Sequence, residues 1–124
     1  MKSKIGCVEQ KIKMLERNPY QIIKNRHVTE KSLVLQELKN AESSASLKRC
    51  KSPKYVFTVD KKATKHEIAK AIEEIYKDED ITVVSVNTIN LKPKKRRVRG
   101  RMGMRPAIKK AIVTLEEGDS LDNI

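Results

Sequence analysis

Lysine and arginine side chains gather in residues 92–110, where ten of 19 residues are basic and none is acidic. The whole chain has 28 basic and 16 acidic residues, so nearly all of its net charge of +12 lies in this one segment. Guanidinium and ammonium groups at such density bind phosphate oxygens, and a nucleic acid backbone is the usual polyanion. A solvated run that only aids solubility is the weaker interpretation, because such runs normally mix both signs of charge.

The backbone of this basic segment favours a loop. Gly100, Gly103, Pro93 and Pro106 interrupt it, its like charges repel one another, and it has no apolar face to bury. We therefore expect it to be flexible in the free protein and ordered only on its polyanion. The candidate RNA-binding residues are Lys92, Lys94, Lys95, Arg96, Arg97, Arg99, Arg101, Arg105, Lys109 and Lys110.

Residue patterns for catalysis or metal binding are missing from the sequence. It contains no G-x-S-x-G, Walker A, H-E-x-x-H or paired Cys-x-x-Cys motif. His27 and His66 have no evident orienting partner, and Cys7 and Cys50 have no zinc-ligand spacing. Two free thiols are favoured over a disulfide, which the sequence leaves open. We expect neither an enzyme nor a cofactor or metal site.

Composition bounds the class of protein further. The 124 residues are 38% apolar and 35% charged, which supports one modest core with tails. One Phe, three Tyr and no Trp are too few for a single-strand binder that stacks bases on aromatic rings. No apolar run reaches membrane-spanning length, and we expect neither a secretory signal nor a transit peptide.

Three parts are expected along the chain. Residues 1–18 form an amphipathic or disordered extension, 19–117 an α+β RNA-binding domain, and 118–124 a polar tail. Within the domain, 39–53 has the composition of a flexible insertion and 92–107 forms the basic hairpin loop. The extension carries one apolar stripe at helical spacing, made of Ile5, Val8, Ile12 and Leu15.

The first half of the domain begins with a turn at Asn18 and Pro19. Residues 20–23 fit either a short edge strand or one helical turn. Thr29 is a suitable N-cap for a helix that ends near residue 38. We expect the buried side of that helix to consist of Leu33, Leu35 and Leu38.

The second half has stronger patterns. Residues 55–59 form a strand with Tyr55, Phe57 and Val59 on one face. Thr64 and Glu67 make a capping box that opens a helix. That helix has an apolar stripe of Ile68, Ile72, Ile75 and Tyr76.

Strand-forming runs at 81–91 and 111–115 flank the basic segment. We expect them to pair, with the basic segment as a long loop at the tip of their hairpin. Loops longer than about 12 to 15 residues are usually functional or disordered. The predicted fold class is α+β, an antiparallel β-sheet packed with helices and carrying a long basic hairpin loop. The alternative is a free RNA-binding module with an RNA-recognition-motif-like sheet, for which residues 55–57 are the nearest match to the signature.

Three sequence blocks together resemble a known family. They are H-V-T-E-K-S at 27–32, A-T-K-H-E-I-A-K-A-I-E-E-I-Y at 63–76, and V-V-S-V-N-T at 83–88 continuing to K-K-A-I-V-T-L-E-E-G at 109–118. In this order they resemble bacterial-type large-subunit ribosomal protein L-twenty-three.

The resemblance implies a structural constituent of the large ribosomal subunit, bound to its rRNA near the polypeptide exit tunnel beside neighbouring ribosomal proteins. It implies a docking site at Val28, Thr29 and Glu30 for a trigger-factor-type chaperone, signal recognition particle and the translocon. A second acidic docking position of the family corresponds to Lys77 here. The expected location is a cytoplasmic bacterial ribosome, with an organellar ribosome as the alternative.

Overall fold

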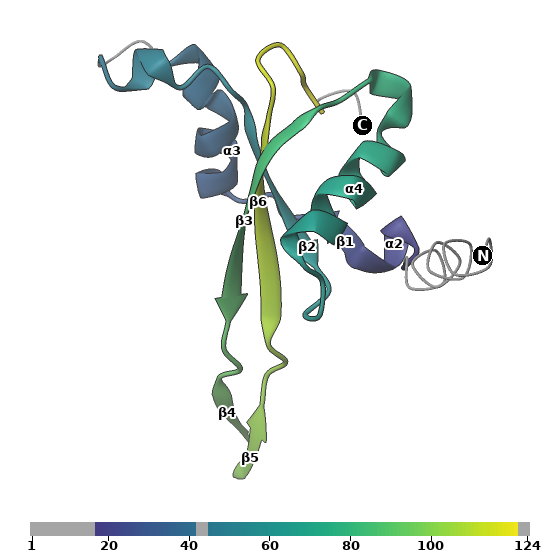
Figure 1. The fold of residues 1–124 in the computed structure, drawn as a ribbon. Coiled ribbons are helices and arrows are strands. Elements are labelled where there is room, and N and C mark those ends of the chain that lie inside the picture. The colour runs from purple at the N-terminus through teal and green to yellow at the C-terminus, as the bar shows by residue number, and fades with distance from the viewer. Residues whose placement is uncertain (1–16, 42–44, 122–124) are drawn as a thin grey trace, which may run out of the picture.

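Residues 17–41 and 45–121 are described by the structure, a computed structural model (Figure 1). The apolar stripe predicted in the N-terminal extension therefore lies outside the described residues, as does Cys7. The elements are α2 (Pro19–Ile22), β1 (Ile23–Arg26), α3 (Glu30–Glu37), η1 (Leu38–Asn40), η2 (Leu47–Arg49), β2 (Lys54–Val59), α4 (Lys65–Ile75), η3 (Lys77–Glu79), β3 (Val83–Leu91), β4 (Lys95–Val98), β5 (Arg101–Met104) and β6 (Ile108–Leu115).

The main sheet has four strands in the order β1-β2-β6-β3, and each neighbouring pair is antiparallel. β4 and β5 form a separate two-stranded sheet. In Figure 1 α3 lies to the left of the strands and α4 to the right, while β4 and β5 extend downward, away from both helices. The α+β fold class predicted from the sequence is confirmed.

The core lies between α4 and one face of the main sheet. Tyr55 and Phe57 of β2 are each 1% exposed, as expected for that face of the strand. They pair with Val113 and Ala111 of β6, which are also buried. The apolar stripe of α4 packs against these strands, with Ile72 fully buried at its centre. Complete burial of one such aliphatic side chain stabilises the fold by about 1.5–3 kcal/mol.

Residues 20–23 satisfy both of the alternatives left open by the sequence. Pro19–Ile22 is one helical turn capped by the Asn18 side chain, and Ile23 then begins the edge strand β1. A helix with Pro in its first turn loses no hydrogen bond, because that N–H would have no partner inside the helix. Ile22 and Ile23 are both buried in the core.

The prediction that Leu33 belongs to the buried side of α3 is wrong. Thr29 is the N-cap as predicted, but Leu33 is 45% exposed, and Leu35 and Leu38 are only partly buried. Ser32 is the buried residue of α3, since its hydroxyl donates to the Thr29 carbonyl and accepts from the Thr29 N–H. The helix contacts β2, and its buried residue is the polar Ser32, while Leu33 faces solvent.

The basic segment is more regular than the loop that we predicted. Glycine and proline content argued for a loop, yet β4 and β5 pair in register from Lys95 with Met104 to Val98 with Arg101. The N–H of Arg105 donates to the carbonyl of Lys94 at 2.8 Å and continues the ladder. β6 also starts earlier than expected, at Ile108. Backbone pairing needs no apolar face, so the charge of the side chains did not prevent a hairpin.

The polar tail contains a core residue that the sequence analysis missed. Leu121 is 1% exposed and belongs to the core cluster. The Arg26 guanidinium donates a hydrogen bond of 3.2 Å to the Leu121 carbonyl and lies 4.9 Å from the centre of the Tyr55 ring. The short turn η1 overlaps the start of the insertion at 39–53, η2 lies inside it, and Cys50 directly after η2 is a free thiol.

Candidate nucleic-acid interface

The hairpin formed by β4 and β5, which we call the basic arm, carries half of the predicted RNA-binding residues. Its strands are joined by Arg99 and Gly100, which have φ of 49° and 79°. Positive φ at both central positions is what a two-residue type I′ turn requires, and its twist matches that of paired strands. Gly100 adopts this conformation without strain, whereas Arg99 does so at some cost and is held at the extreme tip.

Eight cationic side chains of the arm and its base are exposed to solvent. No acidic residue occurs between Asp80 and Glu116, so no carboxylate within this stretch neutralises them. Their mutual repulsion is relieved when a polyanion replaces the surrounding counterions. The exposed residues are Lys92, Lys94, Lys95, Arg96, Arg97, Arg99, Arg101 and Arg105.

The register places cations on both faces of the arm. Cross-strand partners share a face, so Lys95 and Arg97 lie with Met104 and Met102 on one side. Arg96 lies with Gly103 on the other side, which also carries Val98 and Arg101. The arm therefore presents positive charge in both directions and does not have a single binding face.

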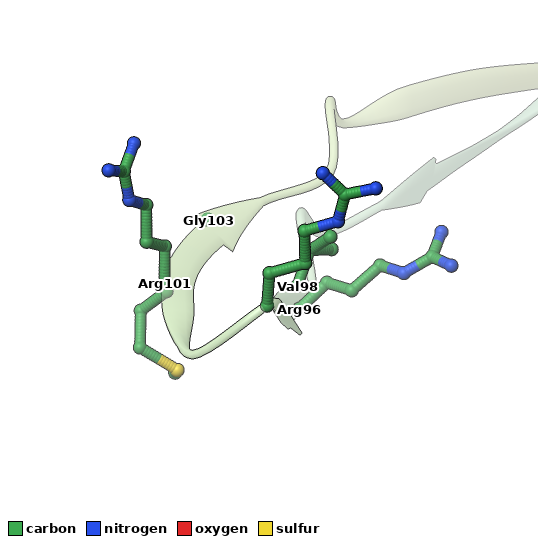
Figure 2. Close-up of a pocket in the computed structure, with 6 residues that line it drawn as sticks. Arg96, Val98, Arg101 and Gly103 are labelled. Carbon is green, nitrogen blue, oxygen red and sulfur yellow. The ribbon is translucent and has the colours of Figure 1, made fainter.

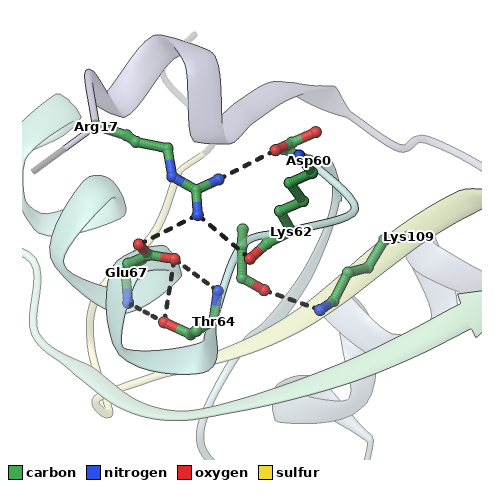
Figure 3. A network of polar contacts seen from close by, with 7 residues as sticks. Arg17, Asp60, Lys62, Thr64, Glu67 and Lys109 are labelled. Atoms are coloured by element: carbon green, nitrogen blue, oxygen red, sulfur yellow. Dashed lines mark hydrogen bonds and ion pairs between the residues drawn. The ribbon is translucent and has the colours of Figure 1, made fainter. Parts of the chain in front are cut away.

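Lys109 and Lys110 are separated from the arm by the structure. Both belong to β6 in the main sheet and are partly buried. The Lys109 ammonium donates to the Ala63 carbonyl at 2.8 Å, and the Lys110 ammonium lies 2.9 Å from Nε2 of His27 (Figure 3 for Lys109). Each lysine thus has a contact partner within the protein.

The predicted docking residues lie together at the N-terminus of α3. Val28, Thr29 and Glu30 are all exposed, and Val28 is followed by the capping box of Thr29 and Ser32. Glu30 in the first turn faces the positive end of the helix dipole. Leu33 and Val34 extend an apolar exposed surface from this point along α3.

A polar network surrounds the predicted capping box at the start of α4, and the part of it made by Arg17 was not found from the sequence. Arg17 forms ion pairs with Asp60 at 3.2 Å and with Glu67 at 3.5 Å, and it donates to the Lys62 carbonyl (Figure 3). The Thr64 backbone N–H donates to Glu67 at 2.8 Å. This hydrogen bond, helped by the Thr64 hydroxyl and the Arg17 charge, lowers the pKa of Glu67 below its ordinary value. The spacing of 43 residues between Arg17 and Asp60 left no local signal.

No described residues form a group of three or more His, Cys, Asp or Glu side chains that could hold a metal ion. His66 is exposed on α4, and the Nε2 atom of His27 is in contact with the Lys110 ammonium. Within the described residues, no helix has the length and apolar character needed to cross a membrane.

Comparison with known proteins decides the family. A family model described as Ribosomal protein L23 matches residues 21–123. The chain belongs to this family. It is 47% identical to the large ribosomal subunit protein uL23 of Chlamydia abortus, 46% to that of Chlamydia caviae and 43% to that of Chlamydia trachomatis serovar D. Each alignment spans 109 residues, covering 85% of this chain and 98% of the relative.

Membership in the L23 family makes the chain a bacterial-type ribosomal protein of the large subunit, with a structural role and no enzymatic one. The family resemblance read from the three sequence blocks is confirmed. Family membership associates the chain with the ribosome. The relatives named above give no support to the alternative of an organellar ribosome.

Proposed function

We propose that the basic arm binds large-subunit rRNA near the polypeptide exit tunnel. The observation that carries this proposal is the set of eight exposed cations on the basic arm and its base, which extend away from the body (Figure 1). No other described part of the chain combines so much positive charge with so little nearby negative charge. The family membership supports rRNA as the polyanion.

The arm suits RNA that surrounds it more than RNA that lies on one side. Cations on both of its faces and at its tip gain most when phosphates lie in every direction. Arginine guanidinium groups bind phosphate oxygens in a forked geometry, which fixes orientation as well as charge. Recognition then depends on the shape of the folded RNA and on its phosphates more than on base edges.

Lys109 and Lys110 have a different role in this proposal. Their internal partners tie β6 to residues at Ala63 and His27, which holds the base of the arm against the body. We assign Lys109 and Lys110 mainly to holding the arm in place, and we treat contact with RNA as a secondary role of these two lysines.

A second part of the proposal concerns Val28, Thr29 and Glu30. These residues and the neighbouring outward side of α3 form an exposed surface outside the basic arm, with an acidic group beside apolar side chains. Such a surface suits a protein partner with basic and apolar side chains. By resemblance to the family, we assign it to docking of nascent-chain factors: a trigger-factor-type chaperone, signal recognition particle and the translocon.

The alternative of an RNA-recognition-motif-like sheet is wrong. That function needs aromatic rings exposed on the sheet for stacking with bases. Tyr55 and Phe57, the candidates for this role, are buried in the core beneath α4. RNA cannot reach them without unfolding the domain.

Association with the large subunit tests the proposal. A tagged copy of the full chain is expressed in a bacterial host, and large subunits are isolated and washed at high salt. We expect the wild-type chain to stay with the subunit, and a variant with Arg96, Arg97, Arg99 and Arg101 changed to Gln to be lost or under-represented. Equal retention of both chains would show that the arm is not the main RNA contact.

A further inference from the structure

Gly103 is a glycine that the fold of the protein does not require. Of the three glycines among the described residues, Gly100 and Gly118 have positive φ, a conformation that other residues rarely adopt. Gly103 lies inside β5 with no positive φ. A Cβ added at Gly103 would meet only the Arg96 carbonyl oxygen, at the ordinary contact distance of 3.8 Å.

Glycine in a strand also weakens the strand, because it has the most conformational freedom to lose and no side chain to pack. In a two-stranded arm with little other support, this cost falls on an element that is already marginal. Neither the backbone conformation nor packing among the described residues explains why this position is glycine. A glycine in a strand often marks the close approach of a ligand to the backbone.

The surroundings of Gly103 offer space for such a ligand. An open hollow of about 620 Å³ lies on this part of the arm, lined by Arg96, Val98, Arg99, Arg101, Met102 and Gly103. Figure 2 shows Arg96 and Arg101 extending from the two strands, with no side chain from Gly103 between them. The lining therefore combines the peptide at Gly103 and apolar side chains with three guanidinium groups.

Resting on the RNA-binding function proposed above, we propose that this hollow is a subsite for one unpaired nucleotide of the RNA. The base lies against the peptide at Gly103 and the side chain of Val98. The guanidinium groups of Arg96 and Arg101 stack on it or hold its phosphates, as arginine does for unstacked RNA bases. The apolar part of the lining favours a base over a lone phosphate, because a phosphate gains nothing from apolar contact.

The opposite face of the arm lacks this arrangement. There Lys95 and Arg97 face the long side chains of Met104 and Met102, both of which are exposed. Each backbone position of β5 on that face carries a methionine side chain, and Met102 also reaches the edge of the hollow. The two faces carry similar charge but differ in how closely RNA can approach, and Gly103 makes that difference.

The test compares Gly103→Ala and Gly103→Val with Met104→Ile in the full chain. Met104 neighbours Gly103 in β5 but projects to the opposite face, so Met104→Ile changes the same strand without entering the hollow. Binding of each variant to protein-free large-subunit rRNA is measured at several salt concentrations. Chemical probing of base and backbone accessibility follows on the complexes, and thermal denaturation checks the fold.

We expect Gly103→Ala to fold at least as stably as wild type and to bind about ten-fold more weakly, with Gly103→Val weaker still. The salt dependence should stay that of wild type, because no cation is removed. One base protected by wild type and by Met104→Ile should become reactive with Gly103→Ala. Wild-type affinity and protection for Gly103→Ala would overturn the subsite, as would a wild-type complex that protects only backbone near the arm.

Failure of the subsite and failure of the proposed function give different results. If the arm does not bind RNA, the variant lacking Arg96, Arg97, Arg99 and Arg101 keeps the salt dependence of wild type. If the arm binds RNA but the hollow takes no base, that variant loses salt dependence while Gly103→Ala binds as wild type does.

Discussion

The backbone N–H of Leu121 donates a hydrogen bond of 3.1 Å to the hydroxyl of Tyr55, 66 residues earlier in the chain. Both residues are buried, so the described residues after β6 are tied into the core through Leu121. The Arg26 guanidinium, which lies over the Tyr55 ring, binds the Leu121 carbonyl from the edge strand. The Tyr55 side chain on β2 thus contacts both Arg26 of β1 and Leu121 at the end of the described chain.

Tyr55→Phe should destabilise the fold by about 1–3 kcal/mol, because the buried N–H of Leu121 would lose its acceptor. Denaturant unfolding measures the effect. Tyr20→Phe is the matched control, since Tyr20 is 72% exposed and its loss of a hydroxyl should change stability by less than about 0.5 kcal/mol. Equal stability of the two variants would mean that the Leu121 bond contributes nothing.

Glu67 should make stability depend on pH. Its pKa in the folded protein lies below the ordinary value of 4.5, because the Thr64 N–H donates to the carboxylate. A lowered pKa means that the stabilising contribution is complete above the ordinary pKa and is lost as the pH falls through the lower folded one. The stability difference between wild type and Glu67→Gln should therefore be constant near neutral pH and shrink under acid conditions. The exposed Glu74→Gln is the control, and a difference that grows on acidification would contradict the assignment.

The basic arm should be the least protected pair of strands in the free protein. Two strands without a third strand or a helix are marginally stable in water, and like charges weaken these further. We expect amide hydrogens of β4 and β5 to exchange much faster than those of β6, and to become protected when rRNA is added. Slow exchange in the free protein would show that the arm is ordered without RNA, contrary to our expectation from its charge.

Glu30→Lys should weaken binding of a chaperone or targeting factor to whole ribosomes while subunit assembly stays normal. A charge at the rim of an interface acts mostly on the association rate and its salt sensitivity. Glu37→Lys, the same reversal at the other end of α3, is the control. Glu30→Lys also costs about 0.3–1 kcal/mol of stability through the helix dipole, so folding is checked separately. Equal factor binding by both variants at low salt would leave Glu30 as a helix-dipole partner only.

The parts of the fold that were predictable have local causes. The capping box of Thr64 and Glu67 spans three residues, and the stripe through Ile72 follows helical spacing. The alternation in β2 likewise identified the buried face. The count of basic residues was enough to identify the segment that contains the arm, because its lysines and arginines are close together in the sequence.

The parts that were missed depend on contacts between distant residues. Leu33 has the residue type of a buried helix position, but in α3 Ser32 is buried and Leu33 is exposed, which depends on how the helix lies on the sheet. Leu121 looked like part of a polar tail because its partners, Tyr55 and Arg26, are far away in sequence. The contacts of Lys109 with Ala63 and of Lys110 with His27 likewise join residues that are distant in sequence.

Salt dependence of RNA binding tests the central claim most directly. Replacing Arg96, Arg97, Arg99 and Arg101 by Gln removes four exposed cations from the arm. The slope of log affinity against log salt should then flatten by about three units, taking about 0.7 to 0.9 per lost phosphate contact. A control variant with the exposed body residues Lys61, Lys65, Lys70 and Lys77 changed to Gln should keep a slope close to that of wild type. An unchanged slope for the arginine variant would contradict the claim that the basic arm is the rRNA contact.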